Sequence, residues 1–277
     1  MLLNIGHLYP DLLNIYGDRG NIICLKKRCQ WRGIEVKVTD VSLDYQLKAG
    51  EFDLFFGGGG QDRQQLIVAK DLQKKARVLK QEALRDVPML TVCGTYQLFG
   101  HFFKTNTGCK IPGISIFDVY TVSSHQRKIG NIVVKLNPLI AQSLSNPVTF
   151  NHSVTQNLVG FENHIGNTFF SRHAKSDSPA RWVTQDTSGT SLALPLTLPL
   201  GKVMKGCGNN GQDKTEGAIF KNVLGTYLHG PLLPKNPHLA DWLIKKALEI
   251  KYKKPIALKS LDDSLEWQAH QAASKRG

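Results

Sequence analysis

The first hundred residues alternate between short apolar runs and segments with helical periodicity. The apolar runs are bounded by turn residues and predict strands. They are Leu2–Ile5, Ile34–Val38, Phe52–Phe56 and Pro88–Val92. Apolar positions with helical spacing follow Asn21, a candidate N-cap, and recur from Leu66 to Ala83. Strands that alternate with helices predict a parallel sheet with helices on both faces.

The pattern changes after Gly100, where short strand-like pieces are separated by Gly, Asn and Ser. These pieces predict additional antiparallel or mixed sheet, and they are Ile114–Val122, Ile129–Val134, Val148–Phe150, Val159–Glu162 and Thr168–Phe170. Residues 171–200 are rich in Ser, Thr and Pro, which favours an inserted or mobile loop. A strand over 222–229 and a helix over Pro237–Ile250 follow. We therefore expect one α/β domain over residues 1–250 and a charged, partly helical tail over 251–277.

Composition narrows the class of protein. The chain has 277 residues with 41% hydrophobic content, which is ample for one large core. No apolar run approaches the length of a membrane span, and the N-terminus lacks the charged region of a signal peptide. We therefore expect a cytoplasmic protein without a transmembrane segment. The five scattered cysteines include no CxxC pair, so neither a disulfide framework nor a metal site is expected.

The net charge of +13 raises the question of a nucleic-acid partner. The basic residues are dispersed over predicted helix surfaces, and no nucleic-acid-binding motif is present. An anionic substrate, an acidic partner protein or a solvated basic surface fits the charge as well. We expect no nucleic-acid partner.

The chain is organised around Pro88–Gly100, where an apolar strand ends on Cys93 and a helical stretch begins at Gly94. This is the layout of a nucleophile elbow, a sharp strand-to-helix turn that holds a reactive atom above the sheet edge. The partial positive charge of a helix N-terminus favours a thiolate. The alternative is a buried structural cysteine.

Cysteine chemistry needs a base and donors for an oxyanion. His229 ends an apolar strand and is the best candidate base, ahead of His7, His152 and His164; a plain loop histidine is the alternative. The Gly57–Gly60 run also follows a strand, so it belongs to the same sheet edge as Cys93. Gly59 or Gly60 is therefore expected to supply one oxyanion N–H, and Gly94 the other. No phosphate-loop motif is present.

Several motifs carry a family resemblance. They are Leu8–Pro10, Tyr16–Asn21, Gly59–Gln64, Val92–Gly100, Gly160–His164, Lys205–Gly211 and Gly225–Lys235. Together they resemble the cobyric-acid-synthase-type class I glutamine amidotransferases, which have a flavodoxin-like α/β fold. Within that family the chain is most similar to the glutaminase subunits of the lipid II isoglutaminyl synthases. The resemblance spans roughly residues 1–250.

The resemblance implies a reaction and a partner. Cys93 would attack the side-chain amide of L-glutamine, and His229 would protonate the leaving ammonia and activate water. Gln97 matches a family position that helps to hold glutamine, and Arg127 is the candidate for its α-carboxylate, with Lys128 as the neighbouring alternative. Ammonia would pass to a MurT-like Mur ligase subunit, forming a heterodimer that amidates D-glutamate in lipid II. No cofactor is expected in this chain, whereas ATP and Mg²⁺ are expected in the partner.

Two departures from the family pattern stand out. Triad-type members carry His-x-Glu, but position 231 is a proline here. The Cys93–His229 pair would then work as a dyad, or take its carboxylate from elsewhere; we hypothesise that the partner supplies it in trans. The stretch between Cys93 and His229 also contains the predicted insertion at about 171–200.

Three other functions remain open from the sequence. A cobalamin-pathway amidotransferase would normally carry a fused ATP-dependent synthetase domain. A cysteine peptidase on a related fold would cleave peptides and ignore free glutamine. A binding module, with Cys93 structural and the positive charge serving nucleic acid, would show salt-sensitive retention of DNA or RNA.

Overall fold

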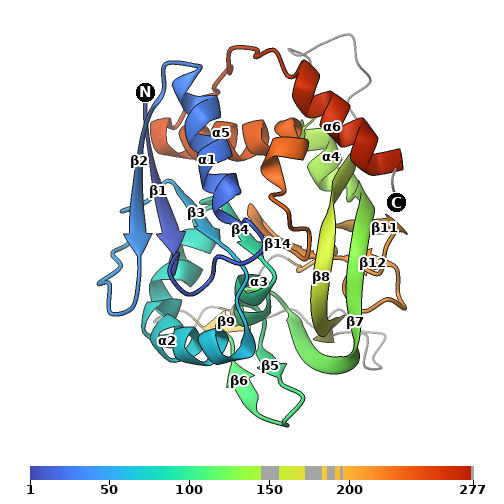
Figure 1. The fold of residues 1–277 in the computed structure, drawn as a ribbon. Coiled ribbons are helices and arrows are strands. Elements are labelled where there is room, and N and C mark those ends of the chain that lie inside the picture. Colours follow the sequence, from blue (N-terminus) through green and yellow to red (C-terminus); the bar gives the residue numbers. More distant parts are fainter. Residues whose placement is uncertain (145–155, 172–182, 186–190, 194–195, 276–277) are drawn as a thin grey trace.

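A computed structural model describes residues 1–144, 156–171, 183–185, 191–193 and 196–275. Its main sheet has six strands in the order β13-β14-β4-β3-β1-β2, all parallel to their neighbours except β13 (Figure 1). The strands are β1 (Leu2–Leu8), β2 (Glu35–Val41), β3 (Leu54–Gly57), β4 (Met89–Val92), β13 (Ala218–Phe220) and β14 (Val223–Thr226). Nearly every residue of β3, β4 and β14 is buried, as expected for central parallel strands. The predicted mostly parallel sheet is confirmed.

Helices cover both faces of this sheet. They are α1 (Arg19–Gln30), α2 (Asp62–Leu84), α3 (Gly94–Phe99) and α5 (Pro237–Tyr252). Helix α1 connects β1 to its neighbour β2, and helix α2 connects β3 to β4 in the opposite direction across the sheet. Because both crossovers are right-handed, the two helices lie on opposite faces. Helix α5 packs with α1, and α3 packs with α2 (Figure 1).

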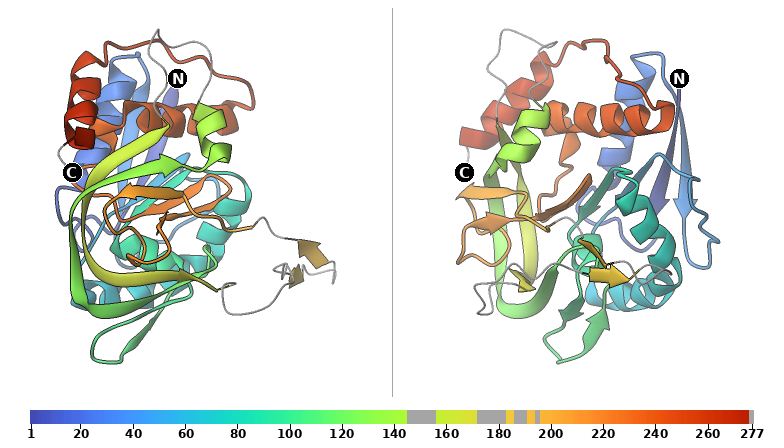
Figure 2. Two further views of the ribbon diagram at one scale, coloured as in Figure 1. Left: turned by 90° about the vertical axis from the view of Figure 1, so that its right-hand side faces the viewer. Right: turned by 180° about the vertical axis from the view of Figure 1, so that it is seen from behind.

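A second sheet has the order β12-β11-β7-β5-β6, with β8 paired to β7. Its strands are β5 (Phe102–Lys104), β6 (Lys110–Pro112), β7 (Val119–Leu136), β8 (Asn157–Phe170), β11 (Gly201–Lys205) and β12 (Thr215–Glu216). Figure 2 shows β7 and β8 as long, curved neighbours. Helix α4 (Pro138–Leu144) follows β7.

The short strands predicted in this region are therefore corrected. Residues Val119–Val122 of the predicted strand Ile114–Val122 and all of Ile129–Val134 fall within the one strand β7, and Val159–Glu162 and Thr168–Phe170 fall within β8. The pairing of β7 with β8 shifts register between Ser123 and Lys128, and a bulge of this kind lets one strand bend without ending. The predicted strand Val148–Phe150 lies outside the described residues.

The C-terminal tail is largely structured. Helix α6 (Ser264–Lys275) contacts β7, β8 and the short helix η2 (Leu233–Lys235) (Figure 1). Within the predicted loop at 171–200, the described residues include β9 (Val183–Gln185) and β10 (Ser191–Ala193), which pair antiparallel. No helix among the described residues combines the length and apolar character that crossing a membrane requires.

Candidate active site

Cys93 occupies a strained turn between β4 and α3. Its φ of 52° and ψ of −103° are unusual for a residue with a side chain, as a nucleophile elbow requires. The backbone is held on both sides, because the Cys93 N–H donates to the carbonyl of Thr226 at 2.8 Å and the Gln97 N–H donates to the Cys93 carbonyl. The side chain is 5% exposed. The predicted elbow is present.

His229 reaches the same edge from the end of β14. Its backbone forms an isolated bridge with Phe161 of β8, which ties the histidine to the second sheet. The ring is fully buried, and Nδ1 lies 3.2 Å from Oδ1 of Asp18, which is also fully buried. His229 Nε2 makes no hydrogen bond with any described residue and is left as the atom available to the thiol.

Asp18 is the carboxylate that the sequence analysis did not find in this chain. It occupies the N-cap position of α1 but makes no side-chain cap. Instead Oδ1 faces His229, and Oδ2 accepts the Gly59 N–H at 2.6 Å. The structure therefore places a carboxylate of this chain beside His229, whereas a carboxylate supplied in trans stays a hypothesis.

Pro231, the departure from His-x-Glu, has a packing role. A Cβ atom on Gly20 would lie only 2.5 Å from Cγ of Pro231, so the proline rests directly on the first turn of α1. That contact brings the segment after His229 against the loop that carries Asp18.

Gly59 separates the nucleophile from the base. A Cβ atom there would lie 3.1 Å from Cβ of Cys93 and 3.1 Å from Cε1 of His229. Its N–H is already donated to Asp18. Gly59 is therefore a spacer, and its expected part in an oxyanion hole is corrected.

The N–H groups of Gly60 and Gly94 remain as the candidate oxyanion donors. No acceptor among the described residues is recorded for either. They are close together, since a Cβ on Gly94 would lie 2.9 Å from the Gly60 nitrogen. The loop is anchored to α3 because Thr95 donates both its N–H and its hydroxyl to the Gly58 carbonyl. Gln65 donates to the Gly60 carbonyl and adds a second anchor.

The electrostatics favour a protonated His229 beside Cys93. Burial alone lowers the pKa of His229, but the negative charges of Cys93 and Asp18 outweigh burial and raise it to about 10. A protonated imidazole beside the sulfur stabilises the nucleophilic form of cysteine.

Gln97 and Arg127 both lie close to this pair. The Gln97 Nε2 donates to the Tyr227 hydroxyl at 3.1 Å, while its buried Oε1 has no partner among the described residues. Arg127 donates from Nε to Asn163 Oδ1 at 2.6 Å and from Nη2 to the Tyr16 hydroxyl at 2.9 Å. The Tyr16 ring packs edge-on against His229, with centroids 5.0 Å apart.

The model of the CobB/CobQ-like glutamine amidotransferase domain matches residues 4–237. This chain belongs to that family. Two lipid II isoglutaminyl synthase subunits are similar to this chain over almost its whole length. It is 39% identical to the lipid II isoglutaminyl synthase (glutamine-hydrolyzing) subunit GatD of Staphylococcus aureus (strain N315), over 99% of this chain and 96% of that one. It is 35% identical to the GatD subunit of Streptococcus pneumoniae (strain ATCC BAA-255 / R6), over 95% and 87% respectively.

A solved structure of a glutamine amidotransferase is more distant. It is 12% identical with a TM-score of 0.48 and covers 88% of this chain and 98% of its own. Membership of the family therefore rests on the sequence matches, which are much closer. Membership also makes this chain a glutamine amidotransferase, as its cysteine and histidine motifs predict.

The two rival histidines that the structure describes, His7 and His164, have other partners. His7 lies on β1 with Nδ1 3.8 Å from Asp40. His164 bonds through Nδ1 to the Gly166 carbonyl and stacks flat on the Tyr227 ring, and burial lowers its pKa. His152 lies outside the described residues. Lys128, the alternative to Arg127, is buried and bonds to Asn167.

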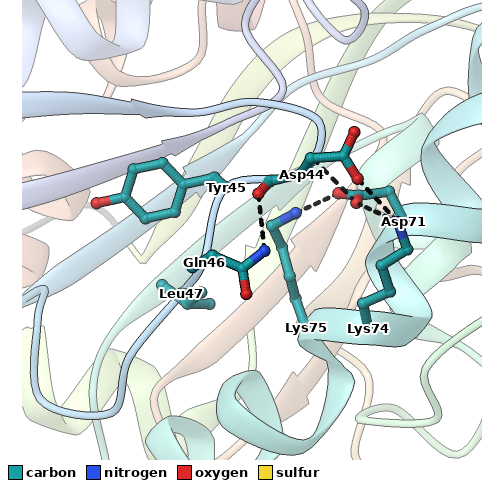
Figure 3. A pocket seen from close by; sticks show the side chains of 7 residues that line it. All are labelled: Asp44, Tyr45, Gln46, Leu47, Asp71, Lys74 and Lys75. Atoms are coloured by element: carbon teal, nitrogen blue, oxygen red, sulfur yellow. Dashed lines mark hydrogen bonds and ion pairs between the residues drawn. The ribbon is translucent and has the colours of Figure 1, made fainter.

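A cavity of about 100 Å³ lies apart from the catalytic residues (Figure 3). The side chains that line it are Asp44, Tyr45, Gln46, Leu47, Asp71, Lys74 and Lys75. The buried Lys75 ammonium pairs with Asp71, which also accepts the Tyr9 hydroxyl and the Asp44 N–H. This network joins the loop after β2 to α2, so the cavity belongs to the scaffold of the family fold.

Proposed function

We propose that this chain is a glutaminase subunit that uses Cys93, His229 and Asp18 to release ammonia from L-glutamine. The observation that carries the proposal is the buried Asp18–His229 pair, with Nδ1 3.2 Å from Oδ1, beside a cysteine at a nucleophile elbow. A carboxylate that accepts from Nδ1 orients the imidazole and leaves Nε2 facing the thiol.

The first half of the reaction makes a thioester. The Cys93 thiolate attacks the side-chain carbonyl carbon of glutamine, and a C–S bond forms as the carbonyl oxygen becomes an oxyanion. The N–H groups of Gly60 and Gly94 would stabilise that charge. When the intermediate collapses, the C–N bond breaks. His229 gives its proton to the leaving nitrogen, and ammonia departs.

The second half regenerates the cysteine. Neutral His229 takes a proton from water, whose oxygen attacks the thioester carbonyl. The C–S bond then breaks, glutamate leaves, and the thiolate and imidazolium are restored. Gln97 and Arg127 would hold the substrate, with the guanidinium on its α-carboxylate.

The ammonia would pass to a MurT-like Mur ligase subunit, which binds ATP and Mg²⁺ and amidates D-glutamate in lipid II. The support for this step is the identity of 39% and 35% to the GatD subunits of two lipid II isoglutaminyl synthases. The same support favours this pathway over a cobalamin-pathway amidotransferase or a peptidase.

The test measures ammonia released from L-glutamine by the purified chain, alone and co-expressed with a Mur-ligase-like partner. Because the carboxylate is in the same chain, we expect hydrolysis by the chain alone, lost in Cys93→Ala and His229→Ala. We expect lipid II amidation only with the partner and ATP. Folded protein that releases no ammonia in either setting would overturn the proposal.

A further inference from the structure

The catalytic groups are closed off from solvent. Cys93 is 5% exposed, and Asp18 and His229 are fully buried. A substrate amide must reach bonding distance of the sulfur, so part of the cover over these groups has to move. Gly59 of the glycine loop lies against Cys93, His229 and Ile15, and the Tyr16 ring packs on His229, so the glycine loop and the Ile15–Tyr16 segment are the two candidates for that movement.

The glycine loop is held firmly. Thr95 donates two hydrogen bonds to the Gly58 carbonyl, and the Gly59 N–H is bonded to the buried Asp18 carboxylate. Movement of this loop would break the contacts that position His229. The loop is therefore a poor route of entry.

Tyr16 is held loosely by comparison. Its φ of 55° lies in the left-handed region, which is unfavourable for a residue with a Cβ atom. The side chain is 40% exposed. Its recorded side-chain contacts among the described residues are the His229 ring and the Arg127 guanidinium. Departure from this φ would relieve backbone strain at Tyr16. The hydrogen bond from Arg127 to the Tyr16 hydroxyl holds the side chain in place, while the Ile15 N–H bond to the Gly59 carbonyl holds the backbone of the preceding residue.

Arg127 lacks the partner that a guanidinium prefers. Both of its recorded acceptors, Asn163 Oδ1 and the Tyr16 hydroxyl, are neutral, and it is exposed. No ion pair is recorded for it among the described residues. A carboxylate binds Arg more strongly than a phenol does, through two parallel N–H···O bonds.

We propose that Tyr16 is a gate over His229 and Cys93, latched by Arg127 and opened by the α-carboxylate of the incoming glutamine. The carboxylate takes over the Arg127 N–H groups, the Tyr16 hydroxyl loses its donor, and the ring moves off the catalytic pair. Tyr16 thereby favours amides that carry a nearby carboxylate. That the α-carboxylate of glutamine opens the gate rests on the proposed function, whereas the hydrogen bond between Arg127 and Tyr16 that holds it closed rests on the geometry alone.

The test is the rate at which iodoacetamide alkylates Cys93, followed by mass spectrometry of its peptide. Iodoacetamide is uncharged and has no carboxylate to open the gate. Tyr16→Phe keeps the ring but removes the latch, so we expect alkylation several-fold faster than in the wild type. Tyr45→Phe is the matched control, because Tyr45 also bonds through its hydroxyl, to Glu51. The exposed Cys109 provides a reference rate in each sample.

Glycine serves as a probe of the opener, because it has the α-carboxylate of glutamine without the side chain. We expect glycine to speed alkylation in the wild type and to have no effect in Tyr16→Phe. The pH profile of alkylation should keep its midpoint in Tyr16→Phe and gain a higher plateau, since access changes and the ionisation of Cys93 does not. A shifted midpoint would indicate an electrostatic role instead.

Equal alkylation rates in the wild type and Tyr16→Phe would overturn the gate, and no effect of glycine on the wild type would overturn its opening by a carboxylate. These results are separable from the glutaminase proposal. A chain that gives the expected alkylation pattern but releases no ammonia retains the gate and loses the proposed function. A chain that releases ammonia but shows no effect of Tyr16→Phe on alkylation retains the proposed function and loses the gate.

Discussion

Oδ1 of Asp18 lies 3.2 Å from Nδ1 of His229, and Oδ2 of the same carboxylate accepts the Gly59 N–H at 2.6 Å. One buried side chain thus fixes both the orientation of the base and the position of the glycine loop. Because Gly59 also separates Cys93 from His229, the three catalytic positions share one network of contacts.

Asp18→Asn should leave the fold intact and lower kcat for glutamine hydrolysis by about 10²- to 10⁴-fold, the loss typical when an orienting carboxylate becomes an amide. The amide NH₂ would face Nδ1 and favour the tautomer that carries its proton on Nε2, where it cannot act as a base. Ammonia release under saturating glutamine measures the effect. Asp11→Asn, an exposed aspartate nearby, is the control. An unchanged kcat would revive a carboxylate from the partner.

Gly59→Ala should reduce activity with little loss of stability. The new Cβ would lie 3.1 Å from Cβ of Cys93, Cε1 of His229 and Cγ1 of Ile15, so these groups must move by a few tenths of an ångström. Misplacement of reacting groups by about 1 Å costs up to about 10²-fold in rate, which sets the upper limit. Steady-state kinetics and a thermal melt on the same sample would measure both. A large fall in melting temperature would show that the glycine serves the fold.

Glu216→Gln should change how stability depends on pH. Glu216 is fully buried, and burial raises its pKa from 4.5 to about 7. Its Oε1 accepts from the Thr226 hydroxyl and the Tyr227 N–H, contacts that glutamine can keep.

The sign follows from proton binding. The folded protein holds this proton more tightly than the unfolded chain, so its contribution to stability is full below about pH 4.5 and is lost as pH rises through about 7. The loss is about 3 kcal/mol at most. Urea melts on both sides of this window should show the wild type losing stability relative to Glu216→Gln. Glu35→Gln, on an exposed edge, is the control. If the stability of Glu216→Gln changed with pH in parallel with that of the wild type, as expected for Glu35→Gln, the prediction would be contradicted.

Asp263→Ala should destabilise the fold through the C-terminal segment. The buried Arg28 of α1 bonds to Asp263, just before α6, and to Asp241 of α5. A buried charge left with no partner costs about 3–5 kcal/mol, and because Arg28 keeps Asp241, the expected cost is smaller, about 1–3 kcal/mol. Lys74→Ala breaks the exposed pair with Asp44 and should cost less than about 1 kcal/mol. Chemical denaturation compares the two. If Asp263→Ala and Lys74→Ala lowered the free energy of unfolding equally, the C-terminal segment would contribute little to stability.

The positions of Cys93, His229 and the glycine loop could be predicted because local sequence carries them. An apolar strand that ends on Cys-Gly, or on His-Gly-Pro, shows where the chain turns at a sheet edge. Asp18 had no such signal, since Gly-Asp-Arg-Gly is typical of any turn that opens a helix. It could have been found from topology, because β1 is parallel to β3 and β4 and the loop after it meets the same edge.

The second sheet was harder to predict. Polar residues and glycines within β7 and β8 read as turns, although the strands continue through them. Strand ends depend on the partner strand, which lies far away in sequence, and on bulges that pairing creates. Gln97 and Arg127 came from family resemblance. Asn163 lies within one of the motifs that resemble the family. Only its hydrogen bond with Arg127 in the structure reveals that it orients the guanidinium.

The pairing of Asp18 with His229 joins positions 211 residues apart, and the Tyr252 hydroxyl bonds to Leu2 across 250. A chain emerging from the ribosome folds its N-terminal part first, when Cys93 is present but its base has not yet been synthesised. The thiol cannot then be paired with an imidazolium. Under the proposed mechanism, growing and truncated chains would therefore spare glutamine, and hydrolysis would begin only after both ends of the domain have met.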